Sequence, residues 1–462
     1  MSANDELDLA LGERYYGGQK KAEERLTNEI IEVIENFIDS RFRADRGPAL
    51  RDAHAKDNGC VSADFVVDAD LDSELEHGVF QRGRRYNAWI RFSNADSEPG
   101  SDRKPDGRGM AIKLTGVGGE KVLSDSEKHT QDFIMINNPR FFVDDLPRYR
   151  DTLEKFLDAR NFIEKLLCVR KLRGRERWLA LRSSLKLIPN PLLTQYWSTT
   201  PYRLGPKLAI KFTAKPHLAP DDAGLHRWSG FFRAGFSLKQ ELEYFLKTRA
   251  ARFDFYIQRY ADEQTTPIED SKVEWTEAAA KLEHVATIMI PAGQVGSYER
   301  DVFCENLSFS PWHCLPDHKP LGAVNRVRKA VYVAISKRRR ELNGAAPSEP
   351  TGNKRFPNWP ERFAGGSAAA ERAIFAGYAR DIQKIQLAAK DRSGAREIVR
   401  AFYVDAILTV PNAVLKILPG IESRLKLGTS AAMPNTGTSS SDSPAARASA
   451  GAQEVRSASR FG

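Results

Sequence analysis

The 462-residue chain is 41% hydrophobic and 28% charged, a composition that allows a sizeable core in one large domain or a few smaller ones. Its net charge of +9 is small against 70 basic and 61 acidic side chains, which favours a solvated surface of mixed charge and argues against a nucleic-acid partner. The 4 cysteines are widely spaced with no C-x-x-C pair, so neither a disulfide scaffold nor a zinc site is expected, and reduced thiols in a cytoplasmic protein fit best.

The N-terminal part predicts an arm followed by an amphipathic helix. Residues 1–19 are polar, show neither the basic nor the apolar region of a signal peptide, and are expected to form a loose arm. From Lys20 to Arg43 apolar residues recur at helical spacing, at Leu26, Ile30, Ile31, Ile34, Phe37 and Ile38. We therefore expect residues 1–45 to form an arm and a helix that packs on the core or on a partner. No apolar run in the chain is long enough for a membrane-spanning helix.

Short alternating runs predict antiparallel strands from about residue 47 to residue 143. Gly- and Asp-rich turns separate these runs, which are Ala63–Val67, Ala88–Phe92, Met110–Leu114 and Phe133–Ile136. Further runs of the same kind follow at Leu208–Phe212, Phe253–Ile257 and Val285–Ile290. This pattern is typical of an antiparallel barrel or meander.

Helical patterns flank the predicted strands. Residues 145–200 are predicted as helical with a basic middle, a further helix is expected at Lys239–Arg249, and another runs from about Gly322 to Leu342. The strands and helices together predict a core domain at residues 46–343.

The remainder of the chain changes in composition. Residues 344–428 contain a linker rich in Pro, Gly and Asn and then two helical stretches. Residues 429–462 are dominated by Ser, Ala, Gly and Asn, and cannot bury enough apolar surface to offset the entropy of ordering. We expect this tail to be disordered.

Two distant stretches carry the residues that point to chemistry. Arg51 stands three residues before His54, and Ala-Lys-x-x-Gly follows the histidine. On the predicted helix after residue 322, offsets of 0, 4, 8 and 11 place a set of polar residues on one narrow stripe: Arg328, Tyr332, Ser336 and Arg339. Taken alone, a histidine is usually a surface or satisfied core residue, and residues 326–340 would be a solvated basic helix. Together the two stretches favour a site that contains a histidine and an arginine-backed tyrosine.

These stretches resemble the haem-dependent catalase superfamily, whose core reads Arg-x-x-His-Ala-Lys near one end and Arg-x-x-x-Tyr-x-x-x-x-x-x-Arg near the other. Arg91-Phe92-Ser93 is similar to the family's Arg-Phe-Ser strand. Asp106–Lys113 is similar to a further strand, in which we interpret the glycines as forming a tight turn. The short core looks more like the catalase-like branch that includes small catalase-related peroxidases. The resemblance implies an α+β fold, an antiparallel eight-stranded β-barrel with flanking α-helices, and a bound haem b.

The resemblance also implies roles for individual residues. His54 would be the distal acid–base that moves the proton of a bound peroxide, and Ser93 would fix its tautomer. Tyr332 would be the iron ligand, with its oxygen supported by Arg328. The remaining arginines of the motifs would bind the haem propionates: Arg51, Arg91 and Arg339.

The asparagine that positions peroxide in this family is displaced in this chain. The segment Asp132–Phe142 resembles the strand that carries it, but a gap-free alignment puts Ile136 at the catalytic position. Asn137 follows one residue later and is our predicted catalytic amide, although one step along a strand reverses the side-chain face. Asn138 keeps the parity of Ile136 and remains the alternative.

The function implied is that of a haem b enzyme that reduces or dismutates hydrogen peroxide or organic hydroperoxides. Ala53 resembles the small apolar residue that catalases have before this histidine, and the resemblance favours peroxide reduction. One alternative is a fatty-acid hydroperoxide-converting haem enzyme of the allene oxide synthase or lyase type, with peripheral membrane contact through residues 165–200 and the C-terminal helices. Another is a non-enzymatic basic binding protein. His313 and His318 are interpreted as structural, and the electron donor, NADPH binding and homo-oligomer formation remain open.

Overall fold

The computed structural model describes residues 7–42, 48–103, 106–123, 127–141, 146–158, 188–218, 237–294, 296 and 298–352. The chain divides into two units, Met1–Arg392 and Ser393–Gly462, and every described residue belongs to the first. The predicted C-terminal helices, the tail and most of the linker lie outside the described residues, as does the basic part of residues 165–200. The domain boundaries therefore stay predictions.

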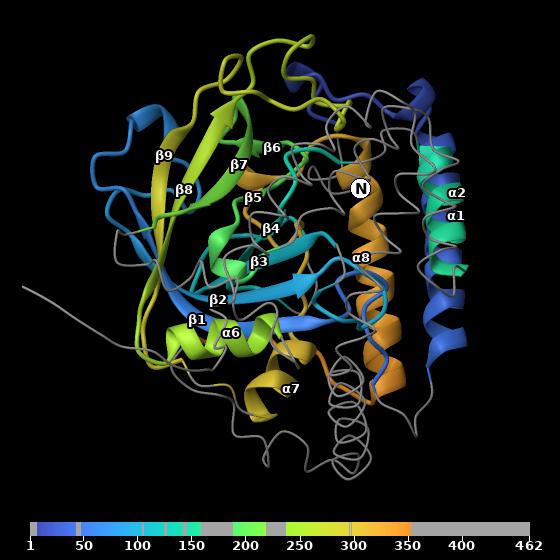
Figure 1. The fold of residues 1–462 in the computed structure, drawn as a ribbon. Helices are drawn as coiled ribbons and strands as arrows, with labels where there is room; N and C mark the ends of the chain where they lie inside the picture. The colour runs from blue at the N-terminus through green and yellow to red at the C-terminus, as the bar shows by residue number, and fades with distance from the viewer. Residues whose placement is uncertain are drawn as a thin grey trace, which may run out of the picture. The chain divides into compact units, whose positions relative to one another are not determined.

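A closed antiparallel barrel forms the centre of the described fold (Figure 1). Its strands pair in the order β5-β4-β3-β2-β1-β9-β8-β7, and β5 also pairs with β7, which closes a ring of eight strands. The short β6 pairs with the other part of β7. The strands are β1 (Asp57–Val67), β2 (Arg85–Asn94), β3 (Arg108–Thr115), β4 (Thr130–Ile136), β5 (Tyr196–Trp197), β6 (Tyr202–Leu204), β7 (Leu208–Pro216), β8 (Ala251–Arg259) and β9 (Glu283–Ile290). The predicted α+β fold with an eight-stranded barrel and flanking helices is confirmed.

Aromatic side chains fill the interior of the barrel. The ring of Phe65 lies 5.7 Å from that of Phe133 and 5.2 Å from that of Phe255, measured between centroids. Phe212 lies 5.6 Å from Phe255 and 5.1 Å from Phe133. Each of these residues comes from a different strand and lies on the inward-facing side that the alternation in the sequence predicts. Because the interior is a packed core, a site has to lie at the wall or outside the barrel.

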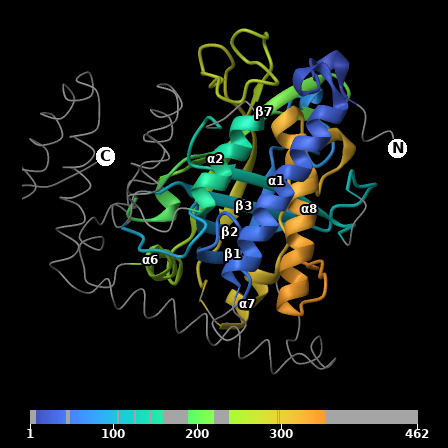
Figure 2. The same cartoon turned by 90° about the vertical axis from the view of Figure 1, so that its right-hand side faces the viewer.

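One helix packs against two others beside the barrel (Figure 2). This helix is α1 (Lys20–Arg41), which is in contact with both α2 (Leu146–Asp158) and α8 (Ala323–Asn343). Their contact is a second apolar cluster, to which α1 contributes the residues that recur at helical spacing and α8 contributes Val327, Val331 and Ile335. Two shorter helices, α6 (Leu238–Leu246) and α7 (Tyr298–Asn306), contact β1. Among the described residues, no helix is long and apolar enough to cross a membrane.

The part of the arm that the structure describes is anchored. Glu13 is 1% exposed, and its carboxylate accepts hydrogen bonds from the backbone N of Gly322 at 2.8 Å and from Arg326 at 2.6 Å. Short 3-10 turns at Leu9–Leu11 and Tyr16–Gly18 lead into α1. The expectation of a loose arm is therefore wrong for this segment, because a buried carboxylate fixes it to the start of α8.

The helical prediction for residues 145–200 holds only for its beginning within the described residues. There α2 ends at Asp158, and Tyr196–Trp197 forms β5, which pairs with both β4 and β7. A strand of two residues is too short to show alternation, so the sequence pattern could not reveal the element that closes the barrel.

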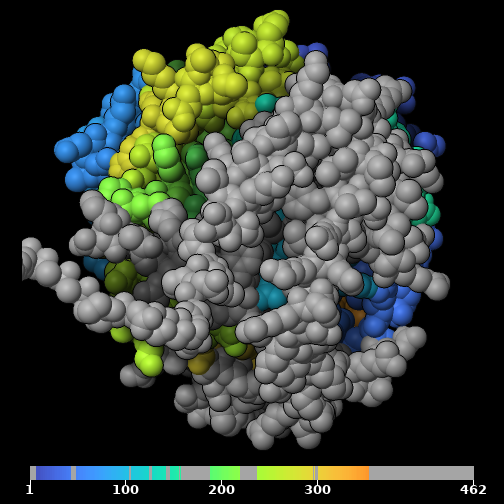
Figure 3. Space-filling model, viewed as in Figure 1, coloured from blue at the N-terminus to red at the C-terminus, as the bar shows by residue number. Residues whose placement is uncertain are grey.

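The first and last strands of the barrel meet at a polar seam. Figure 3 shows the blue surface of the N-terminal part beside the yellow surface of the later strands. Here Nδ1 of His284 lies 3.0 Å from Asp68, and Arg259 pairs with both Glu74 and Glu283. Together with the β1–β9 ladder, the contacts of Asp68 and Glu74 join segments about two hundred residues apart.

Candidate active site

His54 lies just before β1 in an uncommon backbone conformation. Its φ is 59°, in the left-handed region that few residues other than glycine occupy. Two contacts hold this conformation, since the N–H of His54 donates to the carbonyl of Ala95 at 3.2 Å and Arg91 donates to the carbonyl of His54 at 2.9 Å. Strained backbone that the surroundings fix in this way is frequent at functional sites.

The imidazole of His54 is held against the barrel wall. Its Nδ1 lies 2.9 Å from Oγ of Ser93 on β2, so the expected contact between these two residues is present. A Cβ on Gly109 of β3 would lie 2.5 Å from Nδ1 of His54 and 2.6 Å from Oγ of Ser93. Gly109 lies within a strand and provides room for the ring, so our interpretation of this glycine as part of a tight turn is wrong.

The surroundings keep His54 neutral. Burial of the ring and the charges of Arg91, Arg328 and Arg51 lower the pKa of His54 to about 3, although the residue is only half-buried. With Nδ1 engaged by Ser93, Nε2 is the nitrogen that can take up a proton from a ligand.

Tyr332 and Arg328 form the second half of the candidate site, one turn apart on α8. Arg328 donates to the phenol oxygen of Tyr332 at 3.2 Å, and its guanidinium lies 5.3 Å from the centre of the ring. Burial alone would lower the pKa of Arg328, but the oxygens of Tyr332 and Tyr202 outweigh burial and the pKa is raised. Arg328 therefore places a permanent cation against the phenol oxygen of Tyr332.

A buried polar network fixes Arg328. Oδ1 of Asn325 lies 3.0 Å from Arg328 and also accepts from Thr200 at 3.0 Å. The amide nitrogen of Asn325 donates to the carbonyls of Pro201 at 2.9 Å and Leu321 at 3.0 Å. Because the oxygen and the nitrogen of the Asn325 amide both have hydrogen-bond partners, the amide holds the guanidinium of Arg328 in place before any ligand binds.

Arg328 links the two halves of the candidate site. It contacts Tyr332 directly, and its charge also lowers the pKa of His54. A pocket of about 610 Å³ borders Tyr332 and Ser336, and its wall includes Ser308 and His313. Ser336 lies 3.1 Å from Ser308, measured between the two Oγ atoms.

The arginines predicted to bind propionates converge on one carboxylate, Glu305. Oε1 of Glu305 lies 2.8 Å from Arg51 and also pairs with Arg339, while Oε2 lies 3.7 Å from Arg91. The structure therefore brings the three arginines together. Glu305 was missed from the sequence because it lies in a short stretch of α7 that carries no recognisable motif.

Asn137 does not share the face of His54. In the β3–β4 ladder Gly109 pairs with Ile136, and directly paired residues point to the same side of a sheet. Asn137 is buried, and its Oδ1 accepts from the backbone N of Arg108 at 2.8 Å. Asn138 is half-buried, with Oδ1 3.4 Å from the backbone N of Arg140. The register thus places the apolar Ile136 beside the histidine, and a catalytic role for Asn137 stays a prediction.

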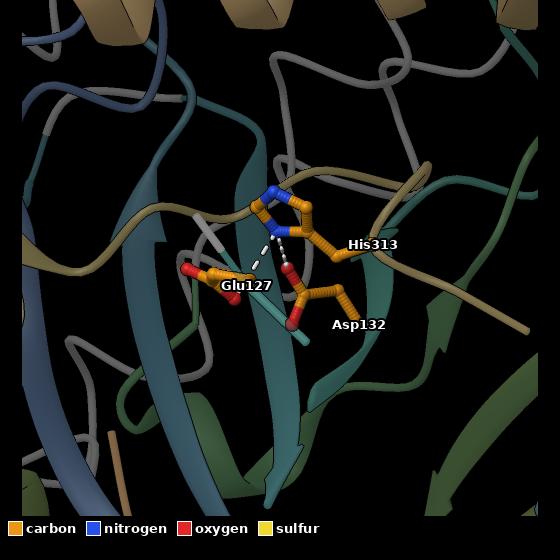
Figure 4. A group of neighbouring side chains, drawn as sticks. All are labelled: Glu127, Asp132 and His313. Atoms are coloured by element: carbon orange, nitrogen blue, oxygen red, sulfur yellow. Dashed lines mark hydrogen bonds and ion pairs between the residues drawn. The ribbon is translucent and has the colours of Figure 1, made fainter. Parts of the chain in front are cut away.

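A buried group on the barrel wall has the composition of a metal site (Figure 4). Nδ1 of His313 lies 2.9 Å from Asp132 and 3.4 Å from Glu127. The ammonium of Lys113 lies 2.7 Å from Asp132 and also pairs with Glu127. Burial opposes the charge of Lys113, but the two carboxylates outweigh it and raise its pKa. Lys113 therefore supplies the positive charge between the carboxylates, and the group fixes the loop through the N–H of Ser310, 2.9 Å from Asp132.

His318 has a structural environment. Its Nε2 accepts from the backbone N of Val79 at 3.0 Å, and its ring packs edge-on against Phe80. Burial lowers the pKa of His318 to about 3, so the ring stays a neutral acceptor.

Neither a protein-family model nor a curated protein matches the sequence. Among solved structures, a fungal catalase is similar at a TM-score of 0.48 and 18% identity, over 64% of this chain and 59% of the catalase. A bacterial catalase is similar at 0.49 and 14% identity, over 67% of this chain and 63% of that one. Catalase A from Saccharomyces cerevisiae is similar at 0.48 and 17% identity, over 68% of each chain. The chain thus spans about three fifths of the first two, and its own strand pairing defines the barrel without them.

Gly109→Ala tests the packing of His54 against β3. The added methyl group would displace the imidazole and the Ser93 hydroxyl, so we expect a loss of about 1–3 kcal/mol in the free energy of unfolding. In a His54→Ala background the same substitution should cost less, because only the contact with Ser93 then remains. Urea unfolding of the four proteins measures this coupling.

Gly118→Ala is the matched control, because a Cβ at Gly118 meets no atom within 4 Å. An equal cost of Gly109→Ala with and without the His54 ring would contradict the proposed packing.

Proposed function

We propose that the chain is a haem b enzyme that reduces or dismutates hydrogen peroxide or organic hydroperoxides. One observation supports this most directly, namely that Arg328 contacts the phenol of Tyr332 and also acts on a neutral His54 held by Ser93. A tyrosinate on one side of a ligand and a neutral imidazole on the other is the combination that this chemistry uses.

The side chains fit this cofactor. Tyr332 would bind the iron, and Arg328 would stabilise its phenolate. Arg51, Arg91 and Arg339 form a cationic cluster suited to the two carboxylates of haem b. When bound, the haem would supply the two-electron chemistry that cleaves a peroxide O–O bond.

The protein's own contribution is control of the proton. Nε2 of His54 would accept the proton of a bound peroxide and return it to the departing oxygen, which would leave as water or alcohol. Ser93 holds the ring orientation through Nδ1, and the arginines around His54 disfavour an imidazolium that would block the first transfer. At neutral pH the imidazole of His54 is therefore unprotonated.

Tyr332→Phe tests the axial ligand. The substitution removes the phenolate oxygen and keeps the ring, so we expect loss of the haem or a large change in the Soret and visible bands of the purified protein. The control is Tyr149→Phe, because Tyr149 lies on α2 and packs against the same apolar cluster as Tyr332. This variant should keep the wild-type spectrum. An unchanged spectrum and full haem content in Tyr332→Phe would remove Tyr332 as the ligand, and a wild-type protein without a Soret band would favour the basic binding protein.

His54 is expected to accelerate the reaction with peroxide. His54→Ala should keep its haem and react about 10²–10⁴-fold more slowly in stopped-flow mixing, the usual contribution of a positioned proton-transfer group. In the wild type the rate should be flat between about pH 5 and 8, because a pKa near 3 leaves His54 neutral across this range.

The same pKa fixes the sign of the effect on stability. An unfolded histidine takes up a proton below about pH 6.5, whereas His54 in the folded protein does not until pH 3 is approached. The contribution of His54 to stability is therefore complete above about pH 6.5 and is lost as the pH falls toward 3.

The pH dependence of the reaction with peroxide checks the same assignment. A reaction rate that halves near pH 6.5 through His54 would contradict a neutral His54.

Dismutation is expected to be slow relative to peroxidation. Dismutation needs a second peroxide held in a fixed position. On the face of the sheet that His54 contacts, Ile136 presents an apolar side chain in place of an amide that could orient this second peroxide. Ile136→Asn should raise oxygen release relative to oxidation of a phenolic donor, measured on one haem-normalised sample. Asn137→Ala and Asn138→Ala are the companions: fast oxygen release in the wild type that is lost only in Asn137→Ala would assign the amide role to Asn137.

A further inference from the structure

We propose that Glu305 is a built-in counterion that competes with the haem carboxylates for Arg51, Arg91 and Arg339, and thereby limits the affinity of the chain for its cofactor. This inference rests on the proposed function. It gives Glu305 a positioning role, because the residue acts through the arginines and not on the reacting atoms.

The geometry makes Glu305 the common partner of three separate elements. Arg51 precedes β1, Arg91 lies on β2 and Arg339 on α8, and all three approach the carboxylate at the end of α7. The side chains of Glu305 and Arg91 are each 4% exposed, that of Arg339 is 10% exposed and that of Arg51 is 14% exposed. At this degree of burial an unpaired charge is costly, so the carboxylate is needed while no other anion is present.

Glu305 is one carboxylate shared by three guanidinium groups. Two further carboxyl groups lie near the cluster. Asp57, 3.9 Å from Arg91, also pairs with Lys239. Burial raises the pKa of Asp52, which acts on Arg51 and Arg339, to about 6. Burial and the neighbouring arginines lower the pKa of Arg339 to about 9, and burial and Arg91 lower that of Arg51. A second carboxylate would therefore be attracted to the cluster, even with Glu305 in place.

Several of the arginine donors, however, are already engaged. Arg51 donates to the carbonyls of Glu305 at 3.2 Å and Leu307 at 2.9 Å, and Arg339 donates to the carbonyl of Ala49 at 3.1 Å. A carboxylate brought by a ligand would share the three guanidinium groups with Glu305 at close range. Two carboxylates so close repel each other, so the arrangement favours ligand binding less than the three arginines alone would.

The test compares Glu305→Gln with wild type for two cofactors. Full-length protein loaded with haem b, or with haem dimethyl ester that lacks free carboxylates, is mixed with excess apomyoglobin, and the rate of cofactor loss is followed in the Soret region. Glu305→Gln should lose haem b about tenfold more slowly than wild type, the equivalent of one charge-assisted hydrogen bond. Loss of the dimethyl ester should change less than about threefold, because no carboxylate competes.

Glu283→Gln is the matched control, since Glu283 pairs with Arg259 at 2.8 Å on the barrel seam. Its rates should equal those of wild type for both cofactors. If Glu305→Gln does not fold, Glu305→Asp keeps the charge but shortens its reach toward the arginines, and should slow haem b loss by a smaller factor.

The outcomes separate this inference from the proposed function. Faster loss of haem b in both Glu305 variants, or equal changes for haem b and its ester, would mean that Glu305 only supports the arginines, and the competition would be refuted. A wild-type protein that takes up neither cofactor would refute the proposed function and this inference with it.

Discussion

Buried positive charge between the barrel and α8 is the constraint on which the site depends. Four arginines, Arg51, Arg91, Arg328 and Arg339, lie there with little exposure to solvent. Each must be matched, because an uncompensated guanidinium in such surroundings destabilises the fold by several kcal/mol. The matching groups are the carboxylate of Glu305, the backbone carbonyls of His54 and Ala55, and the phenol oxygen of Tyr332. The chemistry of the candidate site is therefore a consequence of how these charges are satisfied.

The same charges set the protonation of the groups they surround. The arginines disfavour a proton on His54, and one of them, Arg328, also contacts the phenol oxygen of Tyr332. Neither effect requires a conformational change, because Asn325 fixes Arg328 and Arg91 fixes the backbone of His54. The cost of this preorganisation is the left-handed backbone at His54 and the glycine that must lie under its ring.

Sequence patterns that repeat over several residues predicted most strands, whereas single residues and the two-residue strand β5 carried no such pattern. Alternation over four or more residues located seven of the eight barrel strands, whereas β5, with two residues, was invisible and was assigned to a helix. Motif spacing located His54, Ser93 and Tyr332, and the structure brings His54 and Ser93 into contact. Glu305 and the clearance over Gly109 could not be found, because both depend on which distant segments pack together.

The position of Tyr332 depends in turn on how α8 begins. Two carboxylates from distant segments accept hydrogen bonds from the first backbone N–H groups of this helix, Glu13 from Gly322 at 2.8 Å and Glu269 from Ala323 at 2.7 Å. Anions at a helix N-terminus are stabilised by the peptide dipoles, and these two also hold Arg326. The helix start is thereby tied to the N-terminal arm and to the loop after β8. Because Tyr332 lies on the same helix, contacts that fix the first turn of α8 also constrain the position of the tyrosine along the helix axis. The arm before α1 therefore supports the candidate site through Glu13.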